Sequence, residues 1–81
     1  MNWYLYIIEC SDESLYTGIT KDLERRVSEH NAKNGAKYVK GKLPVKLVYS
    51  ELYNSHAEAL KREIEIKRLN RAEKLKLISG D

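Results

Sequence analysis

The sequence holds a single cysteine, Cys10, which cannot form an internal disulfide. Its cysteine and histidine residues do not follow any spacing typical of a zinc site. No apolar run approaches the roughly 20 residues that a membrane-spanning helix needs, and the N-terminus lacks the order of charged, apolar and small residues found in signal peptides. We therefore expect a cytoplasmic protein without membrane association, in which Cys10 is a small strand residue in a reducing compartment.

Several patterns of catalytic residues are also missing. The sequence has no serine–histidine–acid order and no phosphate-binding glycine loop. What it does have is a hydrophobic fraction of 42% and a charged fraction of 33%, which is typical of a soluble globular domain. We expect its 81 residues to form one domain, residues 1–81, with a modest core.

Acidic residues are absent between His30 and Ser50, within a chain whose net charge is +3. The same stretch contains a series of lysines: Lys33, Lys37, Lys40, Lys42 and Lys46. A one-sided cationic segment that also carries an aromatic residue, Tyr38, suits a phosphate backbone. The other interpretation is a solvated, lysine-rich loop.

Two strands are predicted near the N-terminus, separated by a turn at residues 11–13. The first, Trp3–Cys10, is apolar on both of its alternating sets of residues, and this pattern is typical of a central strand that is covered on both faces. The second strand is predicted at Ser14–Ile19.

The register of this hairpin decides where two tyrosines point. A three-residue loop pairs Tyr6 with Gly18, and Tyr6 and Tyr16 then lie on the same face of the sheet. A loop with an even number of residues would place them on opposite faces unless a bulge restored the phase. Gly18 would leave open space over Tyr6, where another group or a ligand could approach.

A helix near residues 22–32 is predicted to follow, capped by Thr20 or Asp22. On a helical wheel, Leu23 and Val27 mark its inward face.

The same inward arc contains two polar side chains one turn apart, Arg26 and His30. The other polar residues of the helix point elsewhere: Glu24, Arg25, Ser28 and Glu29. A helix that places an arginine and a histidine beside its apolar residues either satisfies buried partners or forms a site.

One more strand and two helices are predicted in the C-terminal half. The strand, Val45–Glu51, should carry Val45, Leu47 and Tyr49 on one face. A capping box that begins at Ser55 starts the second helix.

A second capping box, which begins at Asn70, starts a short last helix that ends before Gly80. Leu75 and Ile78 are expected to dock this helix on the rest of the domain.

The second helix carries a carboxylate, Glu63, in the middle of its apolar face. The residues that form this apolar arc are Ala57, Ala59, Leu60, Ile64 and Ile66. Burying a carboxylate there costs several kcal/mol unless the group is paired or ligates a metal. The alternative to a metal ligand is an ion pair with Lys67, one turn further on, at the edge of the core.

The inward polar residues are consistent with phosphodiester hydrolysis that uses one metal ion. A single carboxylate is too few for a two-metal cage, but it is enough for a Mg²⁺ ion that keeps most of its water shell. An arginine matches the charge and geometry of a phosphoryl group. A tyrosine phenol near a metal or other cations could become acidic enough to act as a base.

Four segments follow one another in the order and spacing of a known motif series: Tyr4-Leu5-Tyr6, Tyr16-Thr17-Gly18, Asp22 to His30, and Ala59 to Lys67. Over almost the whole chain the sequence resembles the GIY-YIG endonuclease superfamily, and most of all its small stand-alone bacterial branch. The resemblance implies an α+β fold with a small three-stranded antiparallel sheet flanked by helices, in the order β-β-α-β-α-α. It also implies Mg²⁺-dependent cleavage of DNA.

The resemblance implies a role for each matching residue. Tyr6 and Tyr16 occupy the tyrosines of the first two motifs. The sequence does not decide which of them is the base; we favour Tyr6, as the base for an attacking water or as a held phenolate, with Tyr16 helping to position that water. Arg26 matches the catalytic arginine and His30 a position that is histidine or tyrosine in relatives; both would stabilise charge on the phosphate. Glu63 matches the single metal-binding glutamate, which would hold one Mg²⁺ or Mn²⁺ ion.

Gly18 occupies the structural glycine of the second motif. Two positions depart from the family pattern: Tyr4 stands where the first motif has its first glycine, and Thr17 stands in place of isoleucine.

DNA is the expected partner, whether duplex, branched or single-stranded, and DNA repair or recombination is the expected setting. The residues expected to contact its backbone are Lys21, Arg25, Lys33, Lys37, Lys40 and Lys42. One short loop offers few groups that read bases, so we expect little sequence preference and salt-sensitive binding. The alternative function is a non-catalytic or weakly active nucleic-acid-binding module on the same fold, with a protein partner that supplies targeting.

Overall fold

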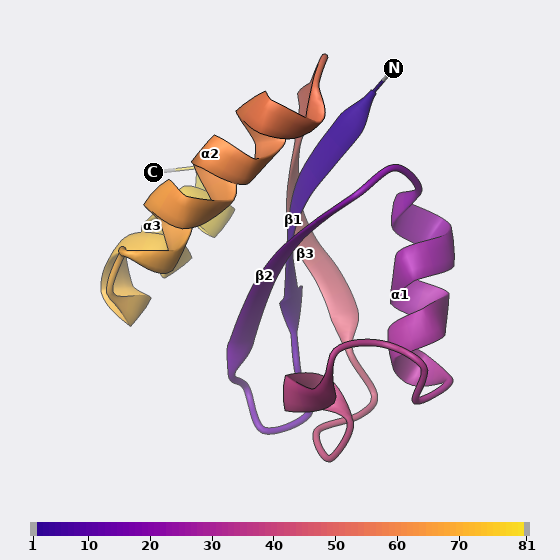
Figure 1. Ribbon diagram of the computed structural model, residues 1–81. Helices are drawn as coiled ribbons and strands as arrows, with labels where there is room; N and C mark the ends of the chain where they lie inside the picture. The colour runs from indigo at the N-terminus through magenta and orange to yellow at the C-terminus, as the bar shows by residue number, and fades with distance from the viewer. Residues whose placement is uncertain (1, 81) are drawn as a thin grey trace.

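The computed structural model describes residues 2–80 and shows an α+β domain (Figure 1). Its elements follow in the order β1 (Trp3–Glu9), β2 (Leu15–Thr20), α1 (Leu23–Asn31), a 3₁₀ turn η1 (Lys37–Val39), β3 (Lys46–Tyr53), α2 (His56–Lys67) and α3 (Arg71–Ser79). The predicted order β-β-α-β-α-α is therefore confirmed, while η1 was not predicted. Within residues 2–80, no helix has the length and apolar character that crossing a membrane requires.

The three strands form one antiparallel sheet in the order β2-β1-β3, with β1 in the centre as predicted. The three-residue turn is confirmed, because the backbone N–H of Cys10 donates to the carbonyl oxygen of Ser14 at 2.8 Å. Tyr6 consequently lies opposite Gly18, and Tyr16, two residues from Gly18, shares a face of the sheet with Tyr6.

The register of β3 contradicts one prediction. Tyr49 lies opposite Ile7, while Leu47 lies opposite Ile8, because the pairing shifts between Ile7 and Ile8. Neighbouring residues of a strand point to opposite faces, so Leu47 and Tyr49 do not share a face as the alternation of β3 had predicted. A bulge of this kind leaves no mark in the alternation of one strand.

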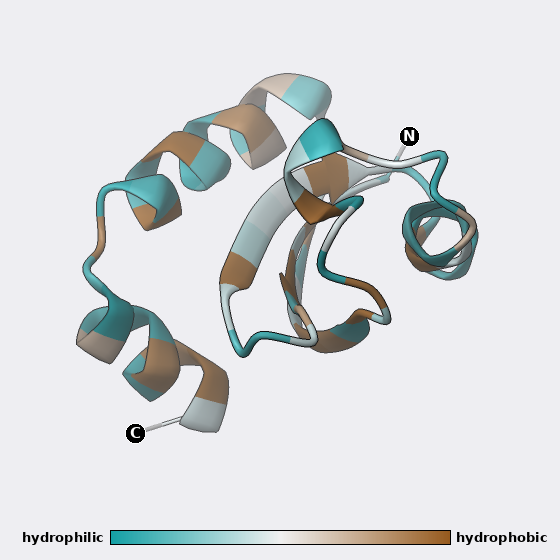
Figure 2. Cartoon of the chain, turned by 90° about the horizontal axis from the view of Figure 1, so that it is seen from below, coloured by the Kyte–Doolittle hydropathy of each residue, from teal (hydrophilic) through white to brown (hydrophobic). Residues whose placement is uncertain are grey.

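Helices cover both faces of the sheet (Figures 1 and 2). On one face, α1 and the loop that contains η1 enclose a core around Tyr6, Ile8 and Val39. On the other face, the helices α2 and α3 cover a core around Leu5, Ile7 and Ile66. The side chains of β1 enter both cores, which explains why both of its alternating sets are apolar.

The helix starts are those predicted from the capping residues. Asp22, not Thr20, caps α1, since its carboxylate accepts from the backbone N–H of Arg25 at 3.1 Å. Ser55 caps α2 in the same way, and Asn70 forms a complete capping box at the start of α3. Gly80 ends α3 with a φ of 82°, a left-handed conformation that suits glycine.

The inward faces of α2 and α3 differ in part from the prediction. Ala59 and Ile66 are buried under α2, but Leu60 and Ile64 are exposed, because the contact with the sheet follows a narrower stripe than the apolar arc. In α3, Ile78 packs on the core as expected. Leu77 takes the second docking position in place of Leu75, which is exposed.

An ion pair between Glu51 of β3 and Arg62 fixes α2 on the edge of the sheet. The guanidinium donates two hydrogen bonds to the carboxylate, at 2.9 and 3.1 Å, and the hydroxyls of Tyr49 and Tyr53 donate to it as well. Burial raises the pKa of Glu51, but these bonds outweigh that effect and hold the pKa below its usual value. These contacts join α2 to the edge strand β3.

Thr17 of β2 offers a test of this packing. Its side chain is buried, and its hydroxyl has no hydrogen-bond partner among residues 2–80. Thr17→Val keeps the shape and removes the unsatisfied group, so we expect the free energy of unfolding to rise by about 1 kcal/mol. Urea denaturation measures this, with Thr20→Val as the control, because the exposed Thr20 hydroxyl does form hydrogen bonds. A loss of stability in Thr17→Val would contradict the interpretation.

Candidate active site

A hydrogen-bonded pair of buried side chains, Tyr6 and His30, forms the centre of the candidate site. Their exposed fractions are 1% and 0%, and the Tyr6 hydroxyl lies 3.0 Å from Nε2 of His30. A Cβ atom at Gly18 would lie 2.7 Å from the Tyr6 hydroxyl oxygen, so β2 needs a glycine where the Tyr6 ring crosses it. The open space predicted over Tyr6 is therefore filled by the ring of Tyr6 itself.

The loop after α1 sets the protonation of His30. The backbone N–H of Ala36 donates to Nδ1 of His30 at 3.3 Å, so in the neutral ring the proton is on Nε2 and is donated to the Tyr6 oxygen. Burial, together with the nearby charge of Arg26, lowers the pKa of His30 and keeps the imidazole neutral. His30 therefore donates to Tyr6, and its expected role in stabilising charge on the phosphate stays a prediction.

Gly35 allows this loop to approach His30. A Cβ atom at position 35 would lie 2.1 Å from Nδ1 and 2.8 Å from Cα of His30, and the second of these is backbone that cannot swing aside. The sequence marked Gly35 only as one of two loop glycines, and nothing in a single sequence distinguishes it from Gly41.

Gly35→Ala is expected to push the loop away from His30, break the bond from Ala36 and lower the free energy of unfolding by about 1–3 kcal/mol. The ¹⁵N shifts of the His30 ring nitrogens should move from one tautomer toward a mixture. Gly41→Ala is the matched control, because a Cβ atom there meets nothing within 4 Å. An unchanged His30 spectrum in Gly35→Ala would contradict this account.

Arg26 extends the polar cluster toward the surface. It is half-buried on α1, where its guanidinium donates to Glu29 at 3.2 Å, and Glu29 also pairs with Arg25 at 3.3 Å. Glu29 lies outside the inward arc, as predicted, but a glutamate three residues on can still fold back over the arginine. The pKa of Tyr6 is raised overall, since burial outweighs the opposing hydrogen bond and charge of Arg26.

Tyr16 connects the buried pair, Tyr6 and His30, to the basic loop, which is the lysine-rich segment between α1 and β3. Its ring centroid lies 6.5 Å from that of Tyr6 and 5.6 Å from that of His30. On its other side, the ring of Tyr38 stacks at 5.9 Å with an interplanar angle of 25°, and Nζ of Lys42 lies 3.8 Å from the Tyr38 centroid. The loop that carries the predicted DNA-binding lysines therefore contacts the aromatic cluster directly.

Glu63 approaches the same cluster from α2. Its side chain is only 15% exposed and pairs with Nζ of Lys67 at 3.4 Å, so the ion pair considered as an alternative is present. After burial and the charge of Tyr16, the negative charge of Glu63 also contributes to the raised pKa of Tyr6.

The donor set around Glu63 fits a single hard cation. Within residues 2–80 there is no group of three His, Cys, Asp or Glu side chains that could hold a metal ion between them. A Mg²⁺ ion with one carboxylate ligand would take its other ligands from water and from substrate phosphate. Lys67 is 51% exposed, so its ammonium is free to move off the carboxylate when a cation binds.

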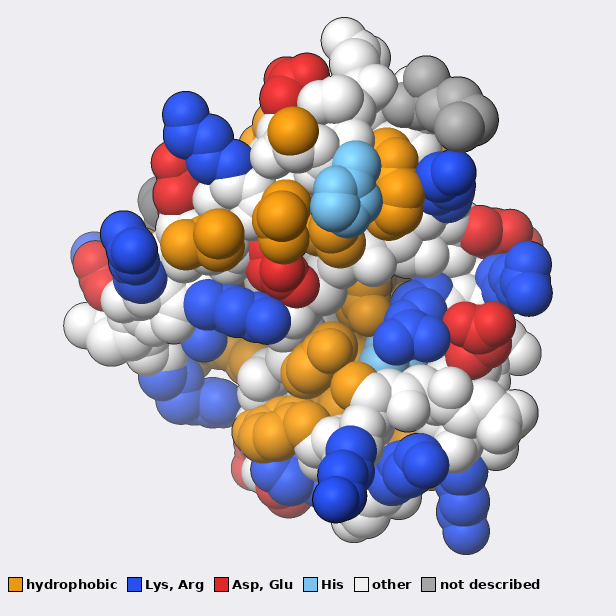
Figure 3. Space-filling model, in the orientation of Figure 1, with side chains coloured by type: hydrophobic (Ala, Val, Ile, Leu, Met, Phe, Trp, Pro, Cys, Tyr) orange, Lys and Arg blue, Asp and Glu red, His pale blue; other side chains and the backbone are white. Residues whose placement is uncertain are grey.

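The predicted DNA-backbone residues lie in different surroundings. Lys33, Lys37 and Lys40 are exposed on the loop after α1, whereas Lys42 pairs with Asp12 at 3.6 Å. On the face seen in Figure 3, hydrophobic side chains gather toward the middle, with basic and acidic side chains around and between them.

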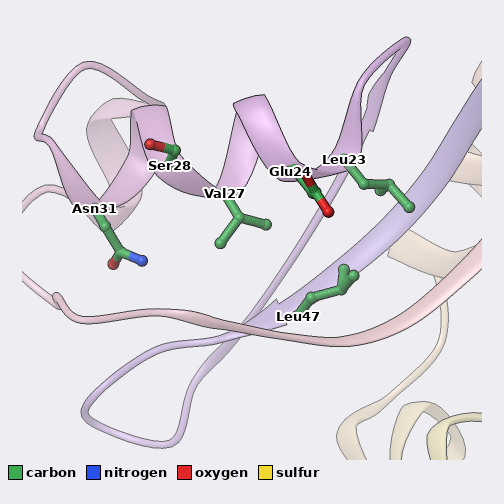
Figure 4. Close-up of a pocket in the computed structure, with 6 residues that line it drawn as sticks. All are labelled: Leu23, Glu24, Val27, Ser28, Asn31 and Leu47. Atoms are coloured by element: carbon green, nitrogen blue, oxygen red, sulfur yellow. The ribbon is translucent and has the colours of Figure 1, made fainter.

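An apolar hollow of about 370 Å³ lies apart from this cluster. Figure 4 shows Leu23 and Val27 of α1 facing Leu47 of β3 across it. None of the residues that line it belongs to the predicted catalytic set, so we place the candidate active site at Tyr6 and not here.

Comparisons with known proteins find similar sequences and a solved structure with a similar fold. A UPF0213 protein of Staphylococcus saprophyticus is 57% identical over 76 residues, which cover 94% of this chain and 93% of that protein. A UPF0213 protein of Haloquadratum walsbyi is 58% identical over 74 residues, covering 91% and 83%. The NMR structure of a UPF0213 protein from Bacillus halodurans superposes with a TM-score of 0.65 and 44% identity, covering 100% of this chain and 86% of that one.

The family model described as the GIY-YIG catalytic domain matches residues 2–76, which is nearly the whole chain. This match supports a nuclease-like role with nucleic acid as the substrate, and proteins with this domain generally use a divalent metal. The resemblance stated from the sequence motifs is confirmed, and the chain belongs to the GIY-YIG family.

Proposed function

We propose that this protein is a Mg²⁺-dependent endonuclease that hydrolyses DNA phosphodiester bonds with little sequence preference, in DNA repair or recombination. One observation carries the proposal: the Tyr6 hydroxyl is held by a buried, neutral His30 beside Arg26, and the charge of the Glu63 carboxylate acts on the pKa of the same phenol. A base, a cation for phosphate and a carboxylate for a metal are the groups that phosphodiester hydrolysis requires.

Arg26 binds the scissile phosphate. Its guanidinium matches two phosphate oxygens, and Glu29 holds it in place until substrate binds. Glu63 is the residue that would hold the divalent ion. When bound, this ion supplies positive charge at the phosphate and the leaving oxygen, and it lowers the pKa of nearby groups.

Tyr6 is the proposed base, with Tyr16 beside it to position the attacking water. Burial raises the pKa of Tyr6 in the free protein, so the phenol is protonated there and must first give its proton to bulk water before it can accept one from the attacking water. His30 favours this loss, because its Nε2–H donates to the phenol oxygen and stabilises negative charge on it.

The test is a cleavage assay on single-stranded, duplex and branched DNA with Mg²⁺ or Mn²⁺. Arg26→Ala should lower the rate of cleavage by about 100-fold, because it removes charge stabilisation at the phosphate. Arg68→Ala is the matched control, since it removes an exposed arginine at the end of α2. Cleavage that is the same in wild type and Arg26→Ala would come from a contaminant and would contradict the proposal.

The raised pKa of Tyr6 and the Lys67–Glu63 ion pair favour a second candidate, a nucleic-acid-binding module without appreciable cleavage. In the same assay this candidate predicts DNA binding without cleavage, with or without a divalent metal. A partner protein would then supply the chemistry or the targeting.

A further inference from the structure

A second hollow, of about 320 Å³, lies between the start of β1, the end of β2 and the first turns of α1. Figure 1 shows these three segments meeting beside the N-terminus. Trp3 and Ile19 line it with apolar surface, and Lys21, Arg25 and Arg26 line it with positive charge. Its size is at the lower end of the range for small-ligand sites, roughly 300–1,000 Å³. Arg26 belongs both to this hollow and to the candidate active site.

Trp3 presents an aromatic surface to the hollow. Its indole is half-buried, and its edge-on partner is the ring of His56, with centroids 4.6 Å apart at 75°. Nζ of Lys21 lies over the ring, 5.2 Å from its centroid. Lys21 is an exposed side chain, so its ammonium can leave the ring and bind an anion while another flat group takes its place.

The positive charge of the hollow is arranged to meet a phosphate chain. Arg25 is exposed and Arg26 half-buried, and both share the carboxylate of Glu29. The carboxylate of Asp22 is committed to capping α1. When an anion enters, the two arginines give up their surface ion pairs with Glu29, which contribute little to stability. They gain bidentate contacts between their guanidinium groups and the anion.

We propose that this hollow binds one unpaired nucleotide next to the scissile phosphate, with its base on the indole of Trp3 and its flanking phosphate at Lys21 and Arg25. The inference rests on the proposed nuclease function, because Arg26, which lines the hollow, is also the residue proposed to bind the scissile phosphate. A base inside a duplex is stacked on both sides and cannot lie on an indole. The substrate class is therefore DNA with an unpaired nucleotide at the cut, such as a single strand, a bulge or a fork.

Trp3 is the only tryptophan in the chain, so its fluorescence reports on the hollow alone. Wild-type protein is titrated, without divalent metal, with a short oligothymidine and with an abasic oligomer of the same length and charge. The oligothymidine should strongly quench or shift Trp3 emission at saturation, because its base stacks on the indole. The abasic oligomer carries only phosphates, which can draw Lys21 off the ring but cannot stack, so it should change the emission much less. Equal responses to the two oligomers would overturn the proposal.

Two substitutions test the contribution of the indole. Trp3→Ala should weaken binding of the oligothymidine about tenfold and leave binding of the abasic oligomer unchanged. Trp3→Phe keeps an aromatic ring at the same place, so it should lose less affinity, and it covers the case in which Trp3→Ala does not fold. Leu52→Ala, which removes an exposed apolar side chain from β3, is the control. A similar loss for both oligomers in Trp3→Phe would argue against base recognition.

Cleavage assays separate this proposal from the proposed function. Base-dependent quenching without any metal-dependent cleavage would overturn the nuclease and leave the nucleotide site standing. Metal-dependent cleavage of duplex and single-stranded DNA at equal rates, with no base-dependent quenching, would overturn the nucleotide site and leave the nuclease standing.

Discussion

Replacing Tyr6 by phenylalanine is expected to lower kcat for DNA cleavage by about 10²–10⁴-fold, which is the usual contribution of a general base. The variant loses one oxygen atom from the centre of the candidate site. The aromatic ring still fills the space over Gly18, so the packing of β1 against β2 should persist. Nε2 of His30 loses its acceptor, at a cost of about 1 kcal/mol in the free energy of unfolding.

The pH dependence of cleavage provides a second readout for Tyr6. The pKa of Tyr6 is raised by burial, so the phenolate fraction, and with it the rate, should increase from neutral to alkaline pH. In Tyr6→Phe this increase should disappear along with the activity. A variant that is slow at neutral pH but keeps the alkaline rise would show that another group is the base.

Tyr53→Phe is the matched control for Tyr6→Phe. Tyr53 also donates a hydrogen bond through its hydroxyl, to Glu51 at 2.7 Å, but it does so on the far edge strand β3. Its removal should change stability by about 1 kcal/mol and leave cleavage unchanged. Equal losses of activity in the two variants would mean that Tyr6 contributes to the fold and not to the chemistry.

Much of the site could be predicted because short-range rules determine it. The length of the turn at residues 11–13 sets the hairpin register, and the register places Tyr6 and Tyr16 on one face. The helical period then brings Arg26 and His30 to the inner side of α1. Each of these inferences needs only a few neighbouring residues, and the structure bears each of them out.

The contacts that could not be predicted join segments whose approach depends on backbone detail. The bond from Ala36 to His30 requires the loop to fold back onto α1, which Gly35 permits but does not signal. The shift of register in β3 and the exposure of Leu60 and Ile64 depend on how whole elements pack. These are the features that set the tautomer of His30 and the surface next to Glu63.

Replacing Glu63 by glutamine is expected to lower metal-dependent cleavage about a thousandfold and to abolish saturable binding of Mn²⁺. The amide keeps the shape of the side chain but removes the negative charge that a hard cation requires. The expected change in stability is small, because Lys67, the partner of Glu63, is largely exposed and such pairs contribute about 0–1 kcal/mol. Mn²⁺ binding, followed by its paramagnetic signal, tests the site without relying on activity.

The Glu63→Gln variant also decides between the two interpretations of this carboxylate. If Glu63 serves only the ion pair with Lys67, the substitution will change stability slightly and leave both cleavage and Mn²⁺ binding intact. Glu65→Gln is the matched control, because Glu65 lies on the outer face of the same helix and pairs with Arg62 at 3.3 Å. A metal site at Glu63 predicts that only the first variant loses Mn²⁺ binding, since a carboxylate on the outer face of α2 is not directed toward Tyr6.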